Sequence, residues 1–407
     1  MKFILIILIF TNFFVIYKTV KSKDFMAKPH YTLFVTGYAF YMLLFPFLYV
    51  MDMIPFVYSE TKITISLLIS TFGLMIFYLS YQLILVPTRT ITFGRPFNKG
   101  LSDFGMGYSA IPIFIILMIP LIIFKPSYIN FGVLIVVIMM LAMSPKYKKT
   151  NKFFLYLTLI FVLIFVSATS GGRRDLLVSM MIWYALFVNI NRSSTMNDFK
   201  KSLLVFVITF AGMIYITLAR TFGDNLDLSS DLIRVLQTYQ GVIGSLLVLA
   251  DFAIAYDNYI QIINNTAADG FLGFQSFYRL FLIPIPREIL VNKPMDVQQL
   301  IVSAGYARNN YAGGTSQSTT LIGEFYWNYG IIAVMFGMSM FGFFIRFMDN
   351  LFYKRSPLKI VIALSMLPFS FLVWRGAFST TLIYCLLTTV VCILLLIILN
   401  ITKRTNQ

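Results

Sequence analysis

The sequence predicts an all-α polytopic membrane protein. Hydrophobic residues make up 59% of its 407 residues, charged residues make up only 12%, and the mean hydropathy is +0.82. A chain of this composition has too little polar surface for a water-soluble globular fold. Its apolar runs are also long enough to cross about 30 Å of hydrocarbon as helices. We therefore expect a bundle of transmembrane helices.

About eleven spans are expected, within a range of about ten to thirteen because several apolar runs are short. The first run resembles a signal peptide in length, but lysines follow it and no small-residue cleavage site does, so we expect an uncleaved span. The stretch 241–256, interrupted by Asp251, is a further candidate for a re-entrant segment. The expected spans cover residues 1–17, 31–51, 63–86, 108–124, 129–143, 153–169, 176–190, 202–219, 325–348, 360–378 and 380–401.

Three regions follow from this pattern. Residues 1–219 form a first group of membrane helices, residues 220–324 form one long hydrophilic segment, and residues 325–407 form the last group. The middle region carries nine of the sixteen acidic residues. Its aromatic runs, such as 271–285, predict short amphipathic or re-entrant helices that lie on the bilayer. This long segment is the candidate functional region.

The basic residues orient the chain. Twenty of the 32 lie in short loops on one side, which the positive-inside rule places in the cytoplasm. The N-terminus is then outside and the C-terminus inside. The outer side nevertheless carries eight arginines against four lysines, while the inner side carries six against fourteen. Because arginine offers a rigid two-pronged donor that matches phosphate oxygens, this distribution indicates an anionic ligand at the outer surface.

Six outer arginines are candidates to bind a pyrophosphate. Two of them lie in the turn Ser170–Asp175, where adjacent glycines would let a ligand approach the backbone closely. For Arg173, Arg174, Arg220 and Arg375 the alternative is that the side chain reaches the lipid phosphates, and for Arg287 it is an ordinary solvated loop. The six are Arg173, Arg174, Arg220, Arg279, Arg287 and Arg375.

Glu324 and Asp175 are the candidate catalytic carboxylates. Glu324 lies where the long segment returns to the membrane, and we expect it to be the base or the orienting acceptor for a reacting hydroxyl. Asp175 follows the double arginine, and its alternative role is to cap the next helix. Asp224 and Asp296 are further carboxylates that could take the role of the base.

Tyr326, Trp327 and Asn328 are candidate sugar contacts. They follow Glu324 directly, and aromatic faces beside hydrogen-bonding groups suit sugar rings. The alternative for the rings is the aromatic belt found at membrane interfaces.

Several classes of protein are excluded. The only histidine, His30, is expected at the cytoplasmic mouth of the second span, so histidine-dependent acyltransferases, Ser/His proteases and HExxH metalloproteases do not fit. We expect no metal site and no cofactor. The net charge of +16 is explained by cytoplasmic loops near anionic lipid, so we expect no nucleic-acid partner. Cys385 and Cys392 are expected to be core or lipid-facing residues.

These features resemble the bacterial Wzy-type polymerases of O-antigen and capsular polysaccharide. The motifs that carry the resemblance are Ser170–Asp175, Ile285-Pro286-Arg287, Lys293-Pro294, Gly323-Glu324-Phe325-Tyr326 and Arg375-Gly376. The resemblance implies a GT-C-like membrane glycosyltransferase in the bacterial cytoplasmic membrane. It would transfer a growing glycan from undecaprenyl-pyrophosphate onto a lipid-linked repeat unit at the outer face. The related O-antigen ligases look to depend on an outer-loop histidine that this chain lacks, which favours a polymerase.

The resemblance also implies partners and leaves alternatives. A flippase and a chain-length regulator are candidate protein partners, besides the lipid-linked oligosaccharide and membrane lipid. The main alternative function is a flippase or transporter of lipid-linked oligosaccharides, although transporters tend to have related halves and charged spans. A structural subunit of a polysaccharide assembly machine is a third interpretation, and it predicts that substitutions of the outer arginines are tolerated.

Overall fold

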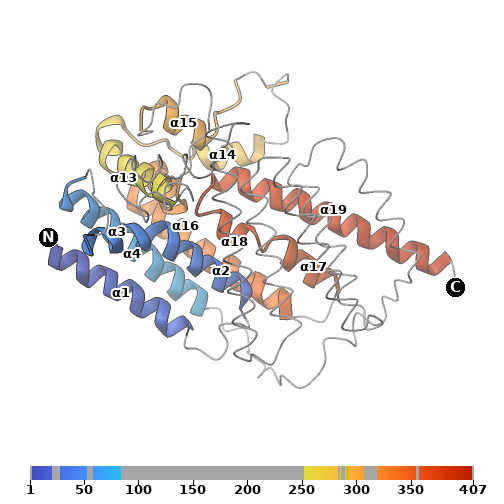
Figure 1. Ribbon diagram of the computed structural model, residues 1–407. Helices are drawn as coiled ribbons and strands as arrows, with labels where there is room; N and C mark the ends of the chain where they lie inside the picture. Colours follow the sequence, from blue (N-terminus) through green and yellow to red (C-terminus); the bar gives the residue numbers. More distant parts are fainter. Residues whose placement is uncertain are drawn as a thin grey trace, which may run out of the picture. The chain divides into compact units, whose positions relative to one another are not determined.

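The computed structural model describes residues 2–20, 28–52, 58–83, 252–282, 285, 289–290, 292–306, 319–353 and 357–405. Within these ranges the regular structure is helical (Figure 1). The chain divides into two compact units. The first comprises residues 1–86, 224–347 and 369–383, and it contains every candidate site residue that the structure describes. The second comprises the remaining residues; in it the Ser365 and Thr389 hydroxyls form a 2.7 Å hydrogen bond.

The first helices agree with the predicted spans to within a few residues. They are α1 (Lys2–Val20), α2 (Pro29–Tyr38), η1 (Ala39–Leu43), α3 (Leu44–Val50) and α4 (Glu60–Leu83). The second span is a continuous path through α2, η1 and α3. Its wide π turn lies just before Pro46, whose ring would clash with the carbonyl of Met42 in an ordinary helix. The π turn therefore accommodates the proline without ending the span.

Polar side chains join the first spans to one another. The Asn12 amide of α1 donates to the Thr71 hydroxyl of α4 at 2.7 Å. The Tyr38 hydroxyl of α2 donates to Asn12 Oδ1 at 2.8 Å, so three helices share one amide. At the end of these helices, Lys2 and Asp52 form an ion pair at 3.0 Å. This pair shows that α1 begins at the same end of the unit at which α3 finishes.

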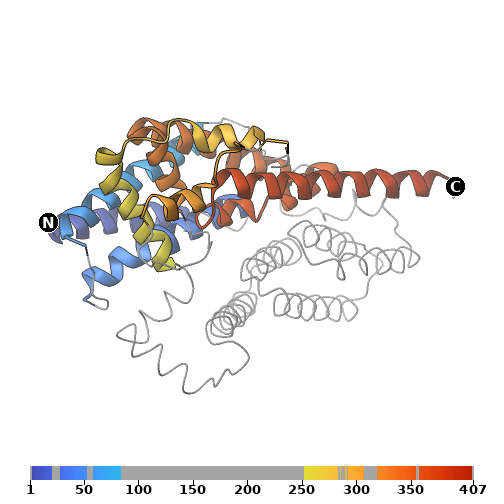
Figure 2. The same cartoon turned by 90° about the horizontal axis from the view of Figure 1, so that it is seen from above.

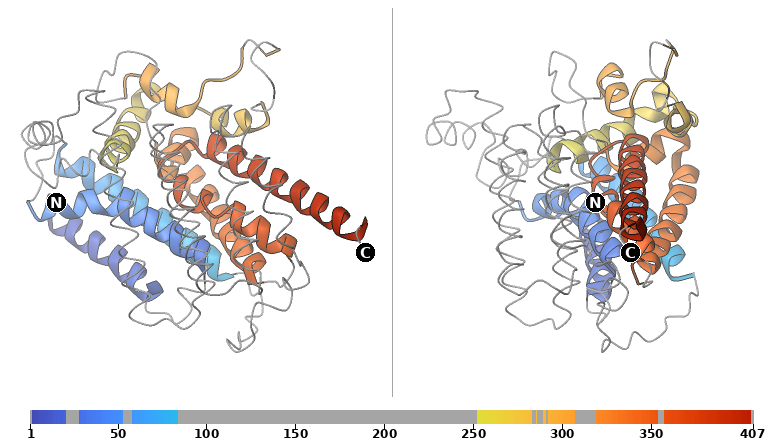
Figure 3. Two further views of the ribbon diagram at one scale, coloured as in Figure 1. Left: turned by 45° about the vertical axis from the view of Figure 1, so that its right-hand side comes forward. Right: turned by 90° about the vertical axis from the view of Figure 1, so that its right-hand side faces the viewer.

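The described part of the long segment contains helices α13 (Phe252–Asp269), α14 (Gln275–Leu282) and α15 (Val297–Ser303). Helix α13 packs against α4, α3 and η1, and the Tyr259 hydroxyl donates to the carbonyl of Ser66 at 2.7 Å. Figure 3 shows α13 beside α4, whereas α14 lies beside the beginning of α19 (Phe378–Thr405). The long segment thus packs directly on the membrane helices in this unit.

Helix α16 (Leu321–Tyr353) is two helices joined across a kink. Tyr329 (φ −149°, ψ 37°) and Gly330 (φ 62°, ψ −146°) leave the helical region and separate a short first piece from the long span. The kink exposes the last carbonyls of the first piece. Those of Trp327 and Asn328 accept hydrogen bonds from the amides of Leu272 and Gly273, at 2.8 and 3.2 Å. The long segment therefore stabilises the kink by pairing the backbone groups that the kink releases.

The C-terminal helices are α17 (Pro357–Ser365), α18 (Phe369–Leu372) and α19 (Phe378–Thr405), and Figure 2 shows α19 as one unbroken helix. The predicted span 360–378 corresponds to α17 and α18, and its helix is interrupted at residues 366–368. Pro368 lacks the amide proton that a continuous helix needs and disfavours helical geometry in the residue before it. The chain then makes a turn at 373–376 before α19 begins.

An aromatic core connects α2, α4, α16 and the turn before α19. The ring centroids of Phe34 and Phe77 are 4.1 Å apart, and those of Phe34 and Trp374 are 4.8 Å apart. The Trp374 Nε1 proton is donated to the Phe34 carbonyl at 2.9 Å. Phe341 and Phe378 extend the core with centroids 5.6 Å apart. This packing fixes where α19 begins, which matters for the site described below.

Three described stretches are long and apolar enough to cross a membrane: Pro29–Val50, Glu60–Leu83 and Leu321–Phe352. Shorter apolar helices occupy Lys2–Tyr17, Val361–Leu372 and Phe378–Leu394. The predicted spans 108–124, 129–143, 153–169, 176–190 and 202–219 lie outside the described residues, as does most of the re-entrant candidate 241–256. The count of eleven spans therefore stays a prediction.

Candidate functional site

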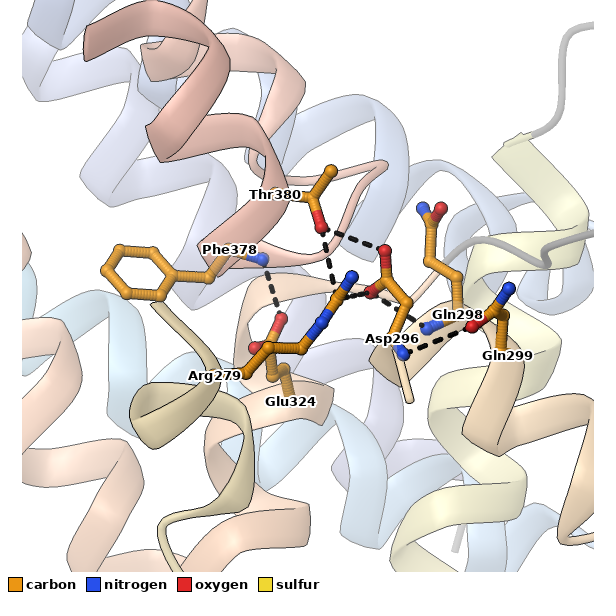
Figure 4. Close-up of polar contacts among 7 residues, drawn as sticks. All are labelled: Arg279, Asp296, Gln298, Gln299, Glu324, Phe378 and Thr380. Carbon is orange, nitrogen blue, oxygen red and sulfur yellow. Dashed lines mark hydrogen bonds and ion pairs between the residues drawn. The ribbon is translucent and has the colours of Figure 1, made fainter. Parts of the chain in front are cut away.

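Four helices bring polar side chains together in the first unit. The N-terminal ends of α16 and α19 meet α14 and the N-terminus of α15 (Figure 4). The close-up shows the Arg279 guanidinium between the carboxylates of Glu324 and Asp296. We call the cluster of Arg279, Asp296, Glu324 and Thr380 the polar junction.

Glu324 is the buried carboxylate of the polar junction. It lies in the first turn of α16 and its side chain has no exposed surface. Its Oε2 accepts the backbone amide proton of Phe378 at 2.7 Å, and this amide belongs to the first residue of α19. The Phe378 ring packs 6.0 Å from that of Phe325, the next residue after Glu324. Packing and hydrogen bonding therefore hold the carboxylate in one orientation.

The other oxygen of the Glu324 carboxylate, Oε1, lacks the kind of hydrogen bond that Oε2 accepts. Glu324 Oε1 is buried and makes no well-formed hydrogen bond within the part of the chain that the structure describes. The Ser276 hydroxyl of α14 does lie near the carboxylate. Burial without a well-formed hydrogen bond is costly for a carboxylate oxygen, so Glu324 Oε1 is suited to accept a proton or a hydroxyl from a ligand.

Asn328 lies one turn after Glu324 on the same face of the short helix. Its amide group donates to the Ser276 hydroxyl at 2.8 Å and to the Glu324 carbonyl at 2.7 Å. Its Oδ1 is buried and has no hydrogen-bond partner among the described residues. Glu324 and Asn328 thus present two buried acceptor oxygens from one helix face.

Arg279 and Asp296 form the charged pair of the polar junction. Arg279 Nη1 and Asp296 Oδ1 are 2.8 Å apart, and both side chains are only about one eighth exposed. The Thr380 hydroxyl donates to Asp296 Oδ2 at 2.8 Å and accepts from Arg279 at 3.3 Å. The pair therefore joins α14 and the N-terminus of α15 to the first turn of α19.

The remaining aromatic candidates differ in exposure. Tyr326 is half-buried, with its ring 6.4 Å from that of Phe271. Trp327 is 3% exposed and belongs to a hydrophobic cluster whose other buried members are Ile262, Val297, Ile301, Tyr306 and Ala377. Its ring lies 5.2 Å from that of Tyr306. In this arrangement Trp327 packs α16 against α15, so it presents little free surface to a sugar.

Tyr306 also anchors the end of α13. Its hydroxyl donates to Asp269 Oδ2 at 2.6 Å. Burial, and then this hydrogen bond, raises the pKa of the Tyr306 phenol above its ordinary value. The phenol therefore remains a donor at any physiological pH.

Arg375 lies in the turn just before α19 and is 8% exposed. The following glycine is tightly packed, because a Cβ atom on Gly376 would lie 2.8 Å from Thr381 Oγ1 and 3.7 Å from Gln298 Nε2. The turn therefore packs against both α15 and α19. Arg375 is thereby placed close along the chain to Phe378, whose amide binds Glu324.

The structure thus brings together part of the predicted site. Arg279 and Glu324 lie together in the polar junction, with Asn328 one turn away on α16 and Arg375 three residues before Phe378. Five predicted residues lie outside the described residues: Arg173, Arg174, Asp175, Arg220 and Arg287. The convergence of six arginines on one pyrophosphate stays a prediction.

Sequence reasoning gave Asp296 a low rank and missed Thr380 and Ser276. A usable signal existed for Asp296, since Asp296 and Gln299 have the spacing of a capping box, and the structure contains both of its hydrogen bonds. That signal identifies a helix start but no ion pair. Thr380 and Ser276 carried no signal, because an isolated hydroxyl in an apolar sequence is common.

The polar junction can hold a proton acceptor and a cation side by side. Glu324 supplies the acceptor, and Arg279 supplies a guanidinium that suits phosphate oxygens. The described residues contain no group of three or more His, Cys, Asp or Glu side chains that could hold a metal ion.

Comparison with known proteins gives one family. The model of the family described as O-antigen polysaccharide polymerase Wzy matches residues 1–406, nearly the whole chain. No curated protein and no solved structure gives a significant match.

Proposed function

The chain belongs to the Wzy family of O-antigen polysaccharide polymerases, and from this premise we propose that it joins lipid-linked repeat units at the outer face of the bacterial cytoplasmic membrane. The donor would be a growing glycan on undecaprenyl-pyrophosphate, and the acceptor the sugar end of a new lipid-linked unit. The family is one of membrane enzymes that act on lipid-linked repeat units, which favours this reaction over transport by a flippase.

The proposed step is a displacement at the anomeric carbon of the donor. A hydroxyl oxygen of the acceptor sugar forms the new bond to that carbon, while the bond from the carbon to the pyrophosphate oxygen breaks. The pyrophosphate leaves with the electron pair, and the hydroxyl proton passes to Glu324. The step needs a proton acceptor at the attacking oxygen and positive charge at the leaving oxygen.

The observation that carries the proposal is the state of the two Glu324 oxygens. Oε2 is fixed by the Phe378 amide, while Oε1 is buried without a well-formed hydrogen bond among the described residues. A base must be held rigidly and still have one lone pair to offer, and Glu324 meets both conditions. Asn328 Oδ1, on the same helix face, would accept a second sugar hydroxyl and so orient the acceptor.

The arginines would supply the positive charge that stabilises the leaving pyrophosphate. Arg279 lies beside Glu324 in the polar junction and would bind the leaving pyrophosphate together with Arg375. We further propose that Arg173, Arg174, Arg220 and Arg287 complete this binding site and that Asp175 is a second candidate base. Of the two candidate aromatic residues, Tyr326 is the more exposed and would contact a sugar ring, whereas Trp327 would support the site by packing.

The test replaces Glu324 by glutamine. Glu324→Gln keeps the side-chain shape and an acceptor for the Phe378 amide, but it removes the basic oxygen. We expect polymer formation from lipid-linked repeat units in proteoliposomes to fall by about 10²- to 10⁴-fold. The repeat units themselves should stay on their carrier unchanged.

Asp52→Asn is the matched control, because it makes the same carboxylate-to-amide change at an exposed ion pair far along the chain from the site. It should give a polymer ladder of normal length and amount. A normal ladder from Glu324→Gln would exclude Glu324 as the base. If the unaltered protein makes no polymer from any lipid-linked unit, the proposed function itself is wrong.

A further inference from the structure

We propose that Asp296 is a positioning residue that holds the Arg279 guanidinium in place and keeps it from pairing with Glu324. This role rests on the proposed function, because it concerns how Arg279 and Glu324 divide their tasks. It adds a residue to which neither the family match nor the reaction above gives a role.

Asp296 is itself held firmly. It is the N-cap of α15, with extended backbone (φ −66°, ψ 144°), and its side chain and that of Gln299 form a capping box. Helix α15 is anchored in turn by Val297 and Ile301, which are fully buried in the cluster around Trp327. The direction of the Asp296 carboxylate is thus set by the backbone and by packing, independently of Arg279.

Arg279 has no comparable support of its own. It is near the end of an eight-residue helix, and a free arginine side chain has about 2 kcal/mol of rotamer entropy to lose on ordering. Within the described residues its polar contacts are Asp296 at 2.8 Å and Thr380 at 3.3 Å, and its Nε has no hydrogen-bond partner there. Asp296 and Thr380 therefore define where the guanidinium lies.

Glu324 is the competing partner. Its carboxylate lies close enough to Arg279 and to Asp296 for both charges to act on it. A buried carboxylate and a nearby guanidinium attract strongly where water is excluded. If Asp296 did not occupy Nη1, Arg279 would be drawn to Glu324, and the base would lose the oxygen that it offers to the substrate.

Thr380 completes the arrangement. Its hydroxyl donates to the Asp296 oxygen that does not face Arg279, so both carboxylate oxygens are engaged. Because Thr380 is in the first turn of α19, this bond also ties Asp296 to the helix whose first amide binds Glu324. Helix α19 thus fixes the Arg279–Asp296 ion pair and Glu324 relative to one another.

The test is a double-mutant cycle between Asp296→Asn and Arg279→Met, measured as initial polymerisation rates in proteoliposomes over a range of repeat-unit concentrations. We expect Asp296→Asn to lower kcat by about ten- to a hundredfold with little change in KM. In the Arg279→Met background the same change should have little further effect, because Asp296 acts through Arg279. Additive effects in the cycle would overturn the proposal.

The matched control is Asp269→Asn, which changes a carboxylate of the same long segment that binds Tyr306 outside the polar junction. A merely structural role for Asp296 would lower the unfolding midpoint and would reduce activity equally in both backgrounds, which also overturns the proposal. The two failures are separable. A protein that makes polymer normally as Asp296→Asn refutes only the positioning role, whereas an unaltered protein that makes none refutes the proposed function.

Discussion

Replacing Gly330 by alanine tests the kink that presents Glu324. Gly330 has φ 62° and ψ −146°, a region that residues with a Cβ atom rarely adopt. The added Cβ would also lie 3.3 Å from two atoms of the Phe271 ring, so that ring must shift. We expect Gly330→Ala to destabilise the protein and to move the short helix that carries Glu324.

The magnitude follows from three contributions. Backbone strain at such a position costs about 1–3 kcal/mol. Loss of the Leu272–Trp327 and Gly273–Asn328 backbone hydrogen bonds, if the kink straightens, costs about 1 kcal/mol each. Reduced freedom of the unfolded chain offsets about 0.4–1 kcal/mol. The expected loss in the free energy of unfolding is therefore about 2–5 kcal/mol, the sum of these contributions.

Gly270→Ala is the matched control. Gly270 also has positive φ, 88°, but an added Cβ would meet no atom within 4 Å. Its cost should be the conformational cost alone, about 1–2 kcal/mol. Denaturant titration in detergent measures both variants, and a polymerisation assay reports whether Glu324 has moved. If Gly330→Ala is no less stable than Gly270→Ala and makes polymer normally, the kink does not position the site.

Two further predictions concern the packing of the first unit. Gly342→Ala would place a Cβ atom 2.6 Å from the Phe77 carbonyl of α4, so α16 and α4 must separate at a cost of about 1–3 kcal/mol. Ser339→Ala, which loses only the 2.9 Å hydrogen bond to Ser80, should cost less when both are compared by unfolding in detergent. Trp374→Phe removes the indole donor to the Phe34 carbonyl and should lower the free energy of unfolding by about 1–3 kcal/mol in the same measurement. An unchanged unfolding midpoint would contradict the role of that hydrogen bond.

The helices were predictable where hydropathy alone decides them. The expected spans 31–51, 63–86 and 325–348 correspond to helical stretches whose bounds differ by a few residues. Such segments form because the bilayer leaves every backbone group to be satisfied within the helix. The break at 366–368 and the π turn before Pro46 have visible proline signals, yet a proline alone does not say whether a span bends, widens or ends.

The sequence predicted the kind of site, a carboxylate accompanied by arginines, but only some of the residues that form it. Glu324 was expected because a carboxylate beside aromatic residues at a membrane boundary is unusual, and the structure buries it against the first amide of α19. Nothing in the sequence indicates that residues 324 and 378 meet, since helix pairing over such a separation depends on packing of the aromatic core. The same holds for Arg279 and Thr380, which are 101 residues apart.

The charges of the described site also constrain how it can work. Arg279 and Arg375 are matched in number by Glu324 and Asp296, so this part of the site holds no surplus of positive charge. Burying a pyrophosphate there without further cations would leave uncompensated negative charge, which is strongly unfavourable away from water. The proposed reaction therefore requires additional cations near the polar junction. Arg173, Arg174, Arg220 and Arg287 are the candidates to supply them, which makes their convergence a condition of the mechanism and not an independent guess.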